Sequence, residues 1–205
     1  MSGLASVSAV HPSVPLGATA SSAHDAVLIE RIAARDRDAM LVLFSAHNAR
    51  VFRFILRMVG DRSLAEDLTS EVFLDVWRQA GQFEGRSTVS TWMLAMARYK
   101  ALAARRRRTE DQLDEEVVEA IEDDGDDPEV AAQKKDRSEI LRRCLDKLSA
   151  QHREIVDLVY YHEKSVEEAA HILSIPQNTV KTRLFHARKR LSAIAAEAGL
   201  DRSYL

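Results

Sequence analysis

Apolar residues recur at helical spacing along most of this 205-residue chain, and no stretch sustains the alternation of apolar and polar residues that marks a strand. The spacing predicts a helix from Asp25 to about Ala46 and a further helical stretch from Val51 to Val59, which ends at Gly60. The residues expected on the buried side are Leu28, Ile32, Ala39, Leu43, Phe44, Val51, Phe52, Ile55 and Met58. The pattern predicts an all-α protein.

Ser63 with Glu66 is a capping box and predicts a helix that runs to Ala80. Its apolar stripe is Leu64, Leu68, Val72 and Val76. Phe73 and Trp77 lie on another side, so either the helix is buried on both sides or one side contacts a partner. Its acidic side chains are Glu66, Asp67, Glu71 and Asp75.

Residues 81–87 form a loop that contains glycine, and Ser90 or Thr91 is expected to cap the following helix. That helix passes from apolar and aromatic residues into four consecutive arginines at 105–108. Cations stabilise any helix C-terminus, but four in a row exceed what a helix end needs. With Arg98, Lys100, Trp92 and Tyr99 they form a basic track with aromatic rings, which is typical of single-stranded DNA binding.

The C-terminal part of the chain predicts a helix after Pro128 that continues through Leu148, then a helix over 155–159 and a helix-turn-helix. Ser165 with Glu168 is a second capping box, and Pro176 interrupts the helix that it starts. The second helix of the pair continues to about Leu191, with Val180, Leu184, Ala187 and Leu191 on its buried side. Polar, aromatic and basic residues occupy the other side, as expected for a helix in a DNA major groove or for a solvated basic surface helix.

Charge is divided unevenly along the chain, whose formal net charge is −3. Residues 109–129 contain twelve acids and no Lys or Arg, so the remainder carries −3 + 12 = +9. The chain is therefore expected to consist of basic modules joined by an acidic linker. Cys144, the single cysteine, excludes an intrachain disulfide and is expected in the core, and the seven histidines lack metal-ligand spacing. Neither a secretory signal nor a run long enough to span a membrane is expected.

The segment SVEEAAHILSIPQNTVKTRLFHARKRL, from Ser165 to Leu191, resembles region 4 of bacterial sigma factors, the subunits that give RNA polymerase its promoter specificity. Ala150 stands where the family often has Pro, and Ser174 where it often has Gly. The resemblance is to the extracytoplasmic function (ECF) group, which keeps only regions 2 and 4. It implies contacts to a −35 element by Asn178, Lys181, Thr182, Arg183, Phe185, His186, Arg188 and Lys189.

The string AEDLTSEVFLDVW is similar to sigma region 2.2, whose helix docks on the clamp helices of polymerase; this implies polymerase contacts by Glu66, Asp67, Glu71 and Asp75. STWMLAMARYKALAARRRR resembles regions 2.3 and 2.4, which open and recognise the −10 element. The implied −10 contacts are Ser87, Trp92, Arg98, Tyr99, Lys100, Arg105 and Arg106. Val89, Tyr99 and Ala103 stand where the family usually has an aromatic residue, Asn and Asp.

The predicted organisation is a disordered tail (1–24), a region 2 helical bundle (25–108), an acidic flexible linker (109–127), a region 4 helix-turn-helix domain (128–196) and a C-terminal tail (197–205). The resemblance implies core RNA polymerase, promoter DNA and an anti-sigma factor as partners, in the cytoplasm. No enzymatic activity, cofactor, metal, membrane insertion or small-molecule substrate is expected.

Two other functions fit parts of the pattern. A stand-alone helix-turn-helix regulator usually dimerises to contact two half-sites, and the sequence shows no convincing heptad zipper for that. A sigma mimic that binds only an inhibitor would be free to lose its DNA-facing cations, which this chain keeps in both modules. A catalytic function has little support, because no triad or paired-carboxylate arrangement is evident.

Overall fold

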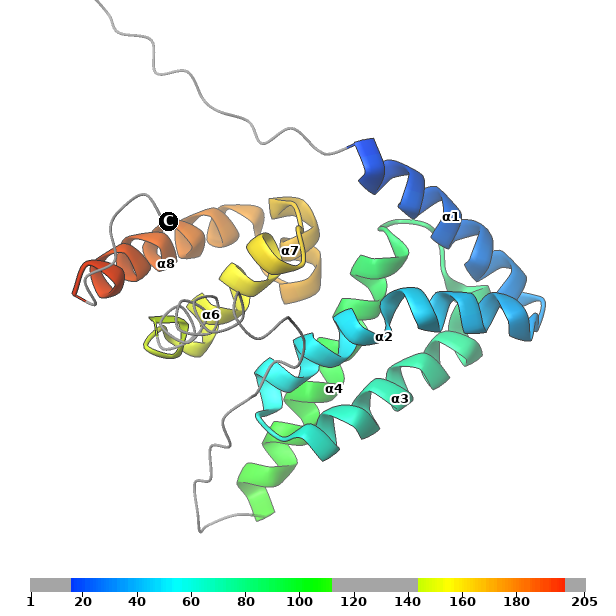
Figure 1. Cartoon of the computed structure of the whole chain (residues 1–205), viewed down its shortest axis with the longest axis horizontal. Helices are drawn as coiled ribbons and strands as arrows, with labels where there is room; N and C mark the ends of the chain where they lie inside the picture. The colour runs from blue at the N-terminus through cyan, green and yellow to red at the C-terminus, as the bar shows by residue number, and fades with distance from the viewer. Residues whose placement is uncertain (1–15, 112–143, 198–205) are drawn as a thin grey trace, which may run out of the picture.

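The computed structural model describes residues 16–111 and 144–197, and within these ranges it contains helices and no strand (Figure 1). The N-terminal module consists of α1 (Leu16–Ala33), α2 (Arg37–Val59), α3 (Arg62–Gln79), the 3-10 turn η1 (Ala80–Gln82) and α4 (Val89–Asp111). The C-terminal module consists of α6 (Ala150–Val156), the π-helical turn η2 (Asp157–Tyr161), α7 (Val166–Leu173) and α8 (Gln177–Glu197). The tail prediction for 1–15 and 198–205, most of the acidic linker and the helix predicted from Pro128 to residue 143 lie outside the described residues.

The single helix predicted from Asp25 to Ala46 is wrong, because the chain turns between α1 and α2. Arg35 has a φ of 68° there, which a continuous right-handed helix does not allow. Asp36 then caps α2 by accepting hydrogen bonds from the backbone N–H groups of Asp38 and Ala39. The hydrogen bond from Ala39, with that from Arg31, lowers the pKa of Asp36. The predicted helix start at Asp25 was also wrong, since α1 begins at Leu16.

The caps of α3 and α4 also differ from the prediction. Asp61, not Ser63, caps α3, and its side chain accepts a hydrogen bond of 3.0 Å from the Leu64 N–H. Thr88, not Ser90 or Thr91, precedes α4, and its hydroxyl oxygen accepts a hydrogen bond of 3.3 Å from the Thr91 N–H. At both helix starts, a capping residue nearer the N-terminus accepts the backbone hydrogen bond. The residues predicted as caps therefore lie inside the helix.

Helix α2 is the centre of the N-terminal module and packs against α1, α3 and α4 (Figure 1). Of the predicted buried side, Ile32, Ala39, Leu43 and Ile55 are fully buried, whereas Phe44 is 39% exposed. Phe44 was therefore wrong as a core residue, and its ring instead meets that of Phe73 edge-on. α2 is long and apolar enough to cross a membrane, contrary to the sequence prediction, and its central place in the module explains this composition.

The C-terminal module confirms the predicted helix-turn-helix. Ser165 and Glu168 form the capping box of α7, and Ser174 (φ 54°) and Pro176 make the turn before α8. The predicted buried side of α8 is confirmed for Val180, Leu184 and Ala187, which are at most 7% exposed. The helix continues past Leu191 to Glu197 because Ile194 and Ala195 are buried as well.

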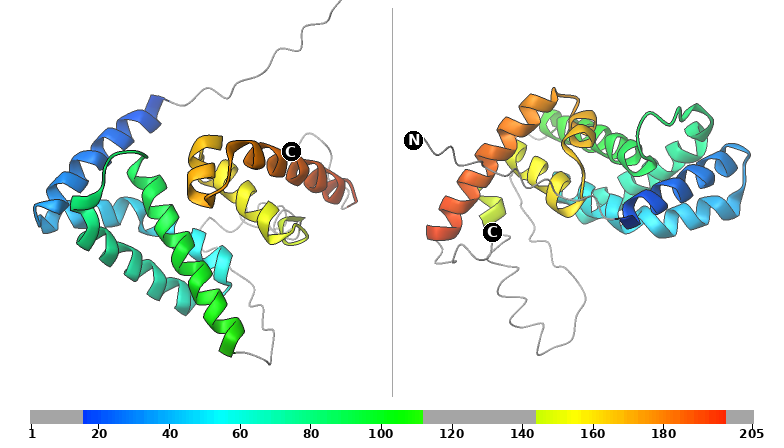
Figure 2. Two further views of the ribbon diagram at one scale, coloured as in Figure 1. Left: turned by 180° about the vertical axis from the view of Figure 1, so that it is seen from behind. Right: turned by 90° about the horizontal axis from the view of Figure 1, so that it is seen from above.

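The two modules are in contact where α7 meets α4. Figure 2 shows α6, α7 and α8 on one side of the molecule and the α1–α4 bundle on the other. Buried apolar side chains of the two modules form one connected core, so the described parts of the chain are a single packed unit.

Candidate nucleic-acid interface

One side of α8 faces solvent with the residues that the sequence singled out. Asn178, Lys181, Thr182, Phe185, His186, Arg188 and Lys189 are exposed, and Arg183 is half-buried. Phe185 is 63% exposed, although burial of a ring that size would stabilise the fold. It meets the His186 ring edge-on at 5.5 Å. α8 therefore presents a polar and aromatic face with cations along it, which is the arrangement that base and phosphate contacts need.

Tyr160 is a residue of this surface that sequence analysis missed. The Arg188 guanidinium donates a hydrogen bond to its hydroxyl and lies 5.4 Å from the centre of its ring. Tyr160 is 53% exposed at the end of η2. The two adjacent tyrosines before the helix-turn-helix were the available signal, but helical spacing does not relate them to α8 because η2 is a π-helical turn.

The aromatic residues predicted for −10 DNA are unequally accessible. Tyr99 is 76% exposed on α4. Trp92 is half-buried and packs against Phe83 at 5.1 Å between ring centres. Ser87 is half-buried in the loop before α4. Only Tyr99 of the two predicted stacking rings therefore stands open to solvent in the described structure.

Most of the α4 cations predicted for DNA have partners within the chain. Arg98 donates to Glu154 of α6 at 2.7 Å. Lys100 pairs with Glu71 and Asp75 of α3 at 2.9 and 2.8 Å. Burial alone would lower the pKa of Lys100, but Asp75 and then Glu71 raise it above its usual value, so the ammonium stays charged.

The arginines at the end of α4 lie farther along the helix. Arg105 and Arg106 are exposed. Arg108 is half-buried and lies 3.6 Å from Asp61, the cap of α3. The arginine run therefore remains at the surface, where phosphate groups can reach it.

The acidic side of α3 lies partly open. Glu66 and Asp67 are exposed, and Glu66 pairs with Arg62 one helical turn away at 3.1 Å. Leu74 is 45% exposed beside them on the same helix, while Phe73 is buried. Phe73 is thus part of the core, whereas Leu74 and the carboxylates of Glu66 and Asp67 remain exposed on this helix.

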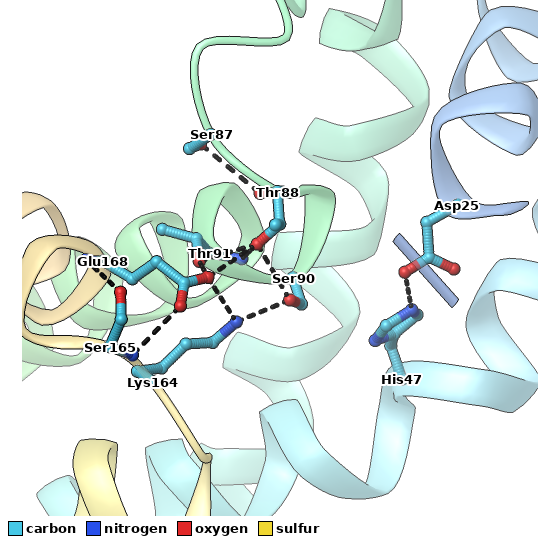
Figure 3. Close-up of polar contacts among 9 residues, drawn as sticks. All are labelled: Asp25, His47, Ser87, Thr88, Ser90, Thr91, Lys164, Ser165 and Glu168. Carbon is cyan, nitrogen blue, oxygen red and sulfur yellow. Dashed lines mark hydrogen bonds and ion pairs between the residues drawn. The ribbon is translucent and has the colours of Figure 1, made fainter. Parts of the chain in front are cut away.

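A partly buried polar cluster joins α7 to the beginning of α4 (Figure 3). Oε1 of Glu168 accepts a hydrogen bond of 2.6 Å from the Thr91 hydroxyl and lies 3.0 Å from that of Thr88. Lys164 Nζ lies 3.2 Å from the same oxygen and donates to Ser90 at 2.6 Å. We call Thr88, Ser90, Thr91, Lys164 and Glu168 the α4–α7 polar cluster. Sequence analysis found only its capping-box role, which uses the other carboxylate oxygen of Glu168.

Within residues 16–111 and 144–197, no His, Cys, Asp or Glu side chains are grouped so as to hold a metal ion. The chemistry that the described surfaces offer is recognition of a polyanion by exposed cations, rings and amide groups on α8 and α4.

Family models match both modules. Sigma-70 region 2 matches residues 43–110, and Sigma-70, region 4 matches residues 138–191, which together make up more than half of the chain. The ECF RNA polymerase sigma factor SigW of Bacillus subtilis (strain 168) is 28% identical over 172 residues, which cover 80% of this chain and 92% of SigW. SigK of Mycobacterium tuberculosis (strain ATCC 25618 / H37Rv), also an ECF RNA polymerase sigma factor, is 27% identical over 170 residues, 80% of this chain and 89% of SigK.

Solved structures show the same fold. CnrH, in complex with the cytosolic domain of CnrY, matches with a TM-score of 0.63 at 20% identity, covering 85% of this chain and 98% of CnrH. The sigma factor RpoE of Bartonella quintana, in complex with the anti-sigma factor NepR, matches with a TM-score of 0.60 at 22% identity, covering 75% and 94%. With both regions matched in family order and a helix-turn-helix in the second, this chain belongs to the sigma-70 family of RNA polymerase sigma factors, in its ECF group.

Proposed function

We propose that this sigma factor binds core RNA polymerase through α3, contacts the −35 element with the exposed face of α8, and holds the −10 element along α4. The exposed face of α8 is the observation that carries the proposal: seven of the eight residues singled out for −35 DNA are exposed there. If α8 served only to pack its module, exposure of the Phe185 ring to water would contribute nothing to stability.

Base and phosphate contacts are divided along α8. Thr182 and His186 lie one turn apart and carry the polar groups that can distinguish base edges. Lys189 lies nearer the C-terminal end and contacts phosphate. Arg188 is positioned by Tyr160, so its guanidinium loses less freedom when it contacts the DNA backbone.

The −10 contact combines the exposed Tyr99 ring with the arginines at the end of α4. A ring beside cations holds a single strand by stacking and by charge. With Tyr99 and Ala103 in place of the usual Asn and Asp, the −10 bases preferred by this chain are expected to differ from those of typical relatives.

Polymerase docking uses the exposed carboxylates Glu66 and Asp67 and the exposed Leu74. An apolar centre with a charged rim is the usual composition of a protein interface. The family to which the chain belongs supplies no catalytic group of its own, so polymerase carries out the chemistry.

Control by an anti-sigma factor in the cytoplasm completes the proposal. CnrH and RpoE, which share this fold, were each solved in a complex, CnrH with the cytosolic domain of CnrY and RpoE with the anti-sigma factor NepR. The same surfaces of this chain, α3 and the DNA faces, are the ones whose masking would block its activity.

The test compares promoter binding and strand opening by the chain alone and with core polymerase added. Specific binding and opening are expected only with core, because holding both modules on one enzyme makes the second DNA contact intramolecular and raises avidity by about 10²–10⁴-fold. Tight sequence-specific duplex binding by the chain alone would favour a stand-alone regulator. Absence of any effect of core would favour a mimic that binds only an inhibitor.

A further inference from the structure

Tyr160 and Arg188 lie at one edge of the surface proposed for the −35 element, and they come from different elements. Tyr160 belongs to η2, before the helix-turn-helix, and Arg188 belongs to α8. Nε of Arg188 donates a hydrogen bond to the Tyr160 hydroxyl, and the guanidinium carbon lies 5.4 Å from the centre of the ring. Both residues are exposed, so this contact adds little to the buried core.

The wide backbone turn of η2 accompanies this position of Tyr160. The His162 N–H donates a hydrogen bond of 3.0 Å to the carbonyl oxygen of Asp157, five residues earlier. An α-helical turn would use the residue four positions earlier, so η2 takes up one extra residue. Leu158 is fully buried, whereas Tyr160 is 53% exposed beside α8. Turns of this kind occur frequently at functional sites.

The pair keeps hydrogen-bond donors that a ligand can use. An arginine side chain only donates, so the Tyr160 oxygen is the acceptor, and its own O–H hydrogen can be donated to a further group. The bond uses one of the five N–H groups of Arg188, and the two Nη atoms carry the other four. A hydroxyl and a guanidinium held side by side are donors of the kind that bind phosphate oxygens.

The partner of Arg188 is neutral, unlike the partners of two other arginines in the chain. Arg98 pairs with Glu154 and Arg57 pairs with Asp157, so a carboxylate offsets each of those two cations. The Tyr160 phenol holds the Arg188 guanidinium without offsetting its charge. An anion can therefore bind Arg188 without first displacing the phenol.

The position of this pair on α8 indicates which anion it would bind. Lys181 lies two turns before Arg188 on the same edge of the helix, and both are exposed. Thr182 and Phe185 occupy the middle of the exposed face. When the middle of such a helix faces the bases of a major groove, each of its edges faces the phosphates of one strand. The ligand expected at this edge is therefore a phosphodiester of duplex DNA.

We propose that Tyr160 and Arg188 form a binding site for one backbone phosphate at the −35 element, to which the Tyr160 hydroxyl and the Nη groups of Arg188 both donate. This site rests on the proposed function, because it needs α8 in the major groove. A contact from η2 lies off the axis of α8, so it helps to fix the rotation of the recognition helix in the groove. Phosphate contacts set position and carry no sequence information, so the site strengthens binding to all −35 sequences alike.

The test measures binding of the chain, in complex with core polymerase, to promoter duplexes in which one phosphate at a time is a neutral methylphosphonate. For the wild type, neutralising one phosphate beside the −35 element should weaken binding about tenfold, since a charged hydrogen bond is lost. Tyr160→Phe and Arg188→Ala should each weaken binding to the unmodified duplex about tenfold. In both variants the loss caused by the same methylphosphonate should shrink to about threefold or less, because the groups act on one phosphate.

Tyr160→Glu separates phosphate binding from simple support of Arg188. A carboxylate still accepts the hydrogen bond from Arg188, but it offsets the charge of the arginine and repels a phosphate. Binding should therefore weaken about 100-fold, and the salt slope should fall by about one. If Tyr160→Glu binds as tightly as the wild type, Tyr160 only supports Arg188 and the phosphate site is wrong.

Tyr161→Phe is the matched control, because the Tyr161 hydroxyl also accepts a hydrogen bond from an arginine, Arg53 of α2, at 3.0 Å. Its affinity for the promoter should equal that of the wild type, and equal losses in the two Phe variants would overturn the site. A wild-type complex that requires the −35 element, with Tyr160→Phe indistinguishable from it, overturns the phosphate site alone. A wild-type complex that binds a scrambled −35 element equally well overturns the proposed function and this site together.

Discussion

The two helices proposed to contact DNA, α8 and α4, differ in how many of the residues concerned already have partners within the chain. On α8, the residues singled out for DNA lie exposed, and the ones that pack lie on the opposite side. On α4, Arg98 and Lys100 are paired with carboxylates of α6 and α3, and Trp92 is half-buried. The surface proposed for the −35 element is thus exposed as folded, whereas Arg98 and Lys100, two of the cations proposed for −10 DNA, would have to exchange partners to bind it.

The difference follows from the position of each helix. α8 lies at the edge of its module and packs against α6 and α7 through one stripe. α4 packs against α2 and α3 and also meets α7 of the other module. A helix with neighbours on several sides has its long cationic side chains within reach of acids from the same chain, and burial favours pairing over solvation.

The largest effect on promoter selection is expected from substitutions in α8. Replacing Lys181 and His186 together by Ala should lower −35 promoter selection about 100-fold in run-off transcription with core, since each lost base or phosphate contact costs about 1–3 kcal/mol. Lys189→Ala is the matched contrast, because loss of a phosphate contact should weaken all promoters alike and reduce the salt slope by about one. Unchanged −35 selection in the double variant would remove α8 from DNA recognition.

The next effect is a loss of folding stability in acid. It tests the carboxylate of Glu168, which contacts Thr91 of the other module. A carboxylate whose pKa falls from 4.5 unfolded to about 2 folded stabilises the native state above pH 4.5, and this contribution is lost as the pH falls towards 2. Urea unfolding at pH 5 and pH 3 should show a loss on the order of 2 kcal/mol for the wild type beyond that of Glu168→Gln. Glu167→Gln should behave as the wild type, and equal losses in all three chains would contradict the charge assignment.

The smallest effect is expected at the end of α4. Replacing Arg105 and Arg106 by Ala should slow strand opening several-fold while closed-complex binding changes less, because these arginines hold DNA only as it separates. A template with a pre-melted bubble should restore much of the lost activity. If the bubble brings no recovery, the two arginines have a structural role, and the contrast between α8 and α4 is sharper than proposed.

Local spacing in the sequence was enough to predict the helix-turn-helix. Ser165, Glu168 and Pro176 fix its start and its break within a dozen residues, and the buried side of α8 repeats at helical intervals. Where two capping residues stand close together, spacing alone was insufficient: Asp61 and Thr88 took the places predicted for Ser63 and for Ser90 or Thr91. The turn at Arg35 was missed because the apolar pattern of α1 and α2 continues across it.

The sequence by itself therefore determined that this is a two-module helical sigma factor and which side of α8 stays polar, because these properties depend on residues three or four positions apart. Only the tertiary structure decided the second role of Glu168, whose other oxygen meets Thr91 across 77 residues of chain, and the pairing of Arg98 with Glu154 across 56. Such contacts depend on how two modules pack, and packing is set by the sum of many weak burial and pairing energies that no local spacing records.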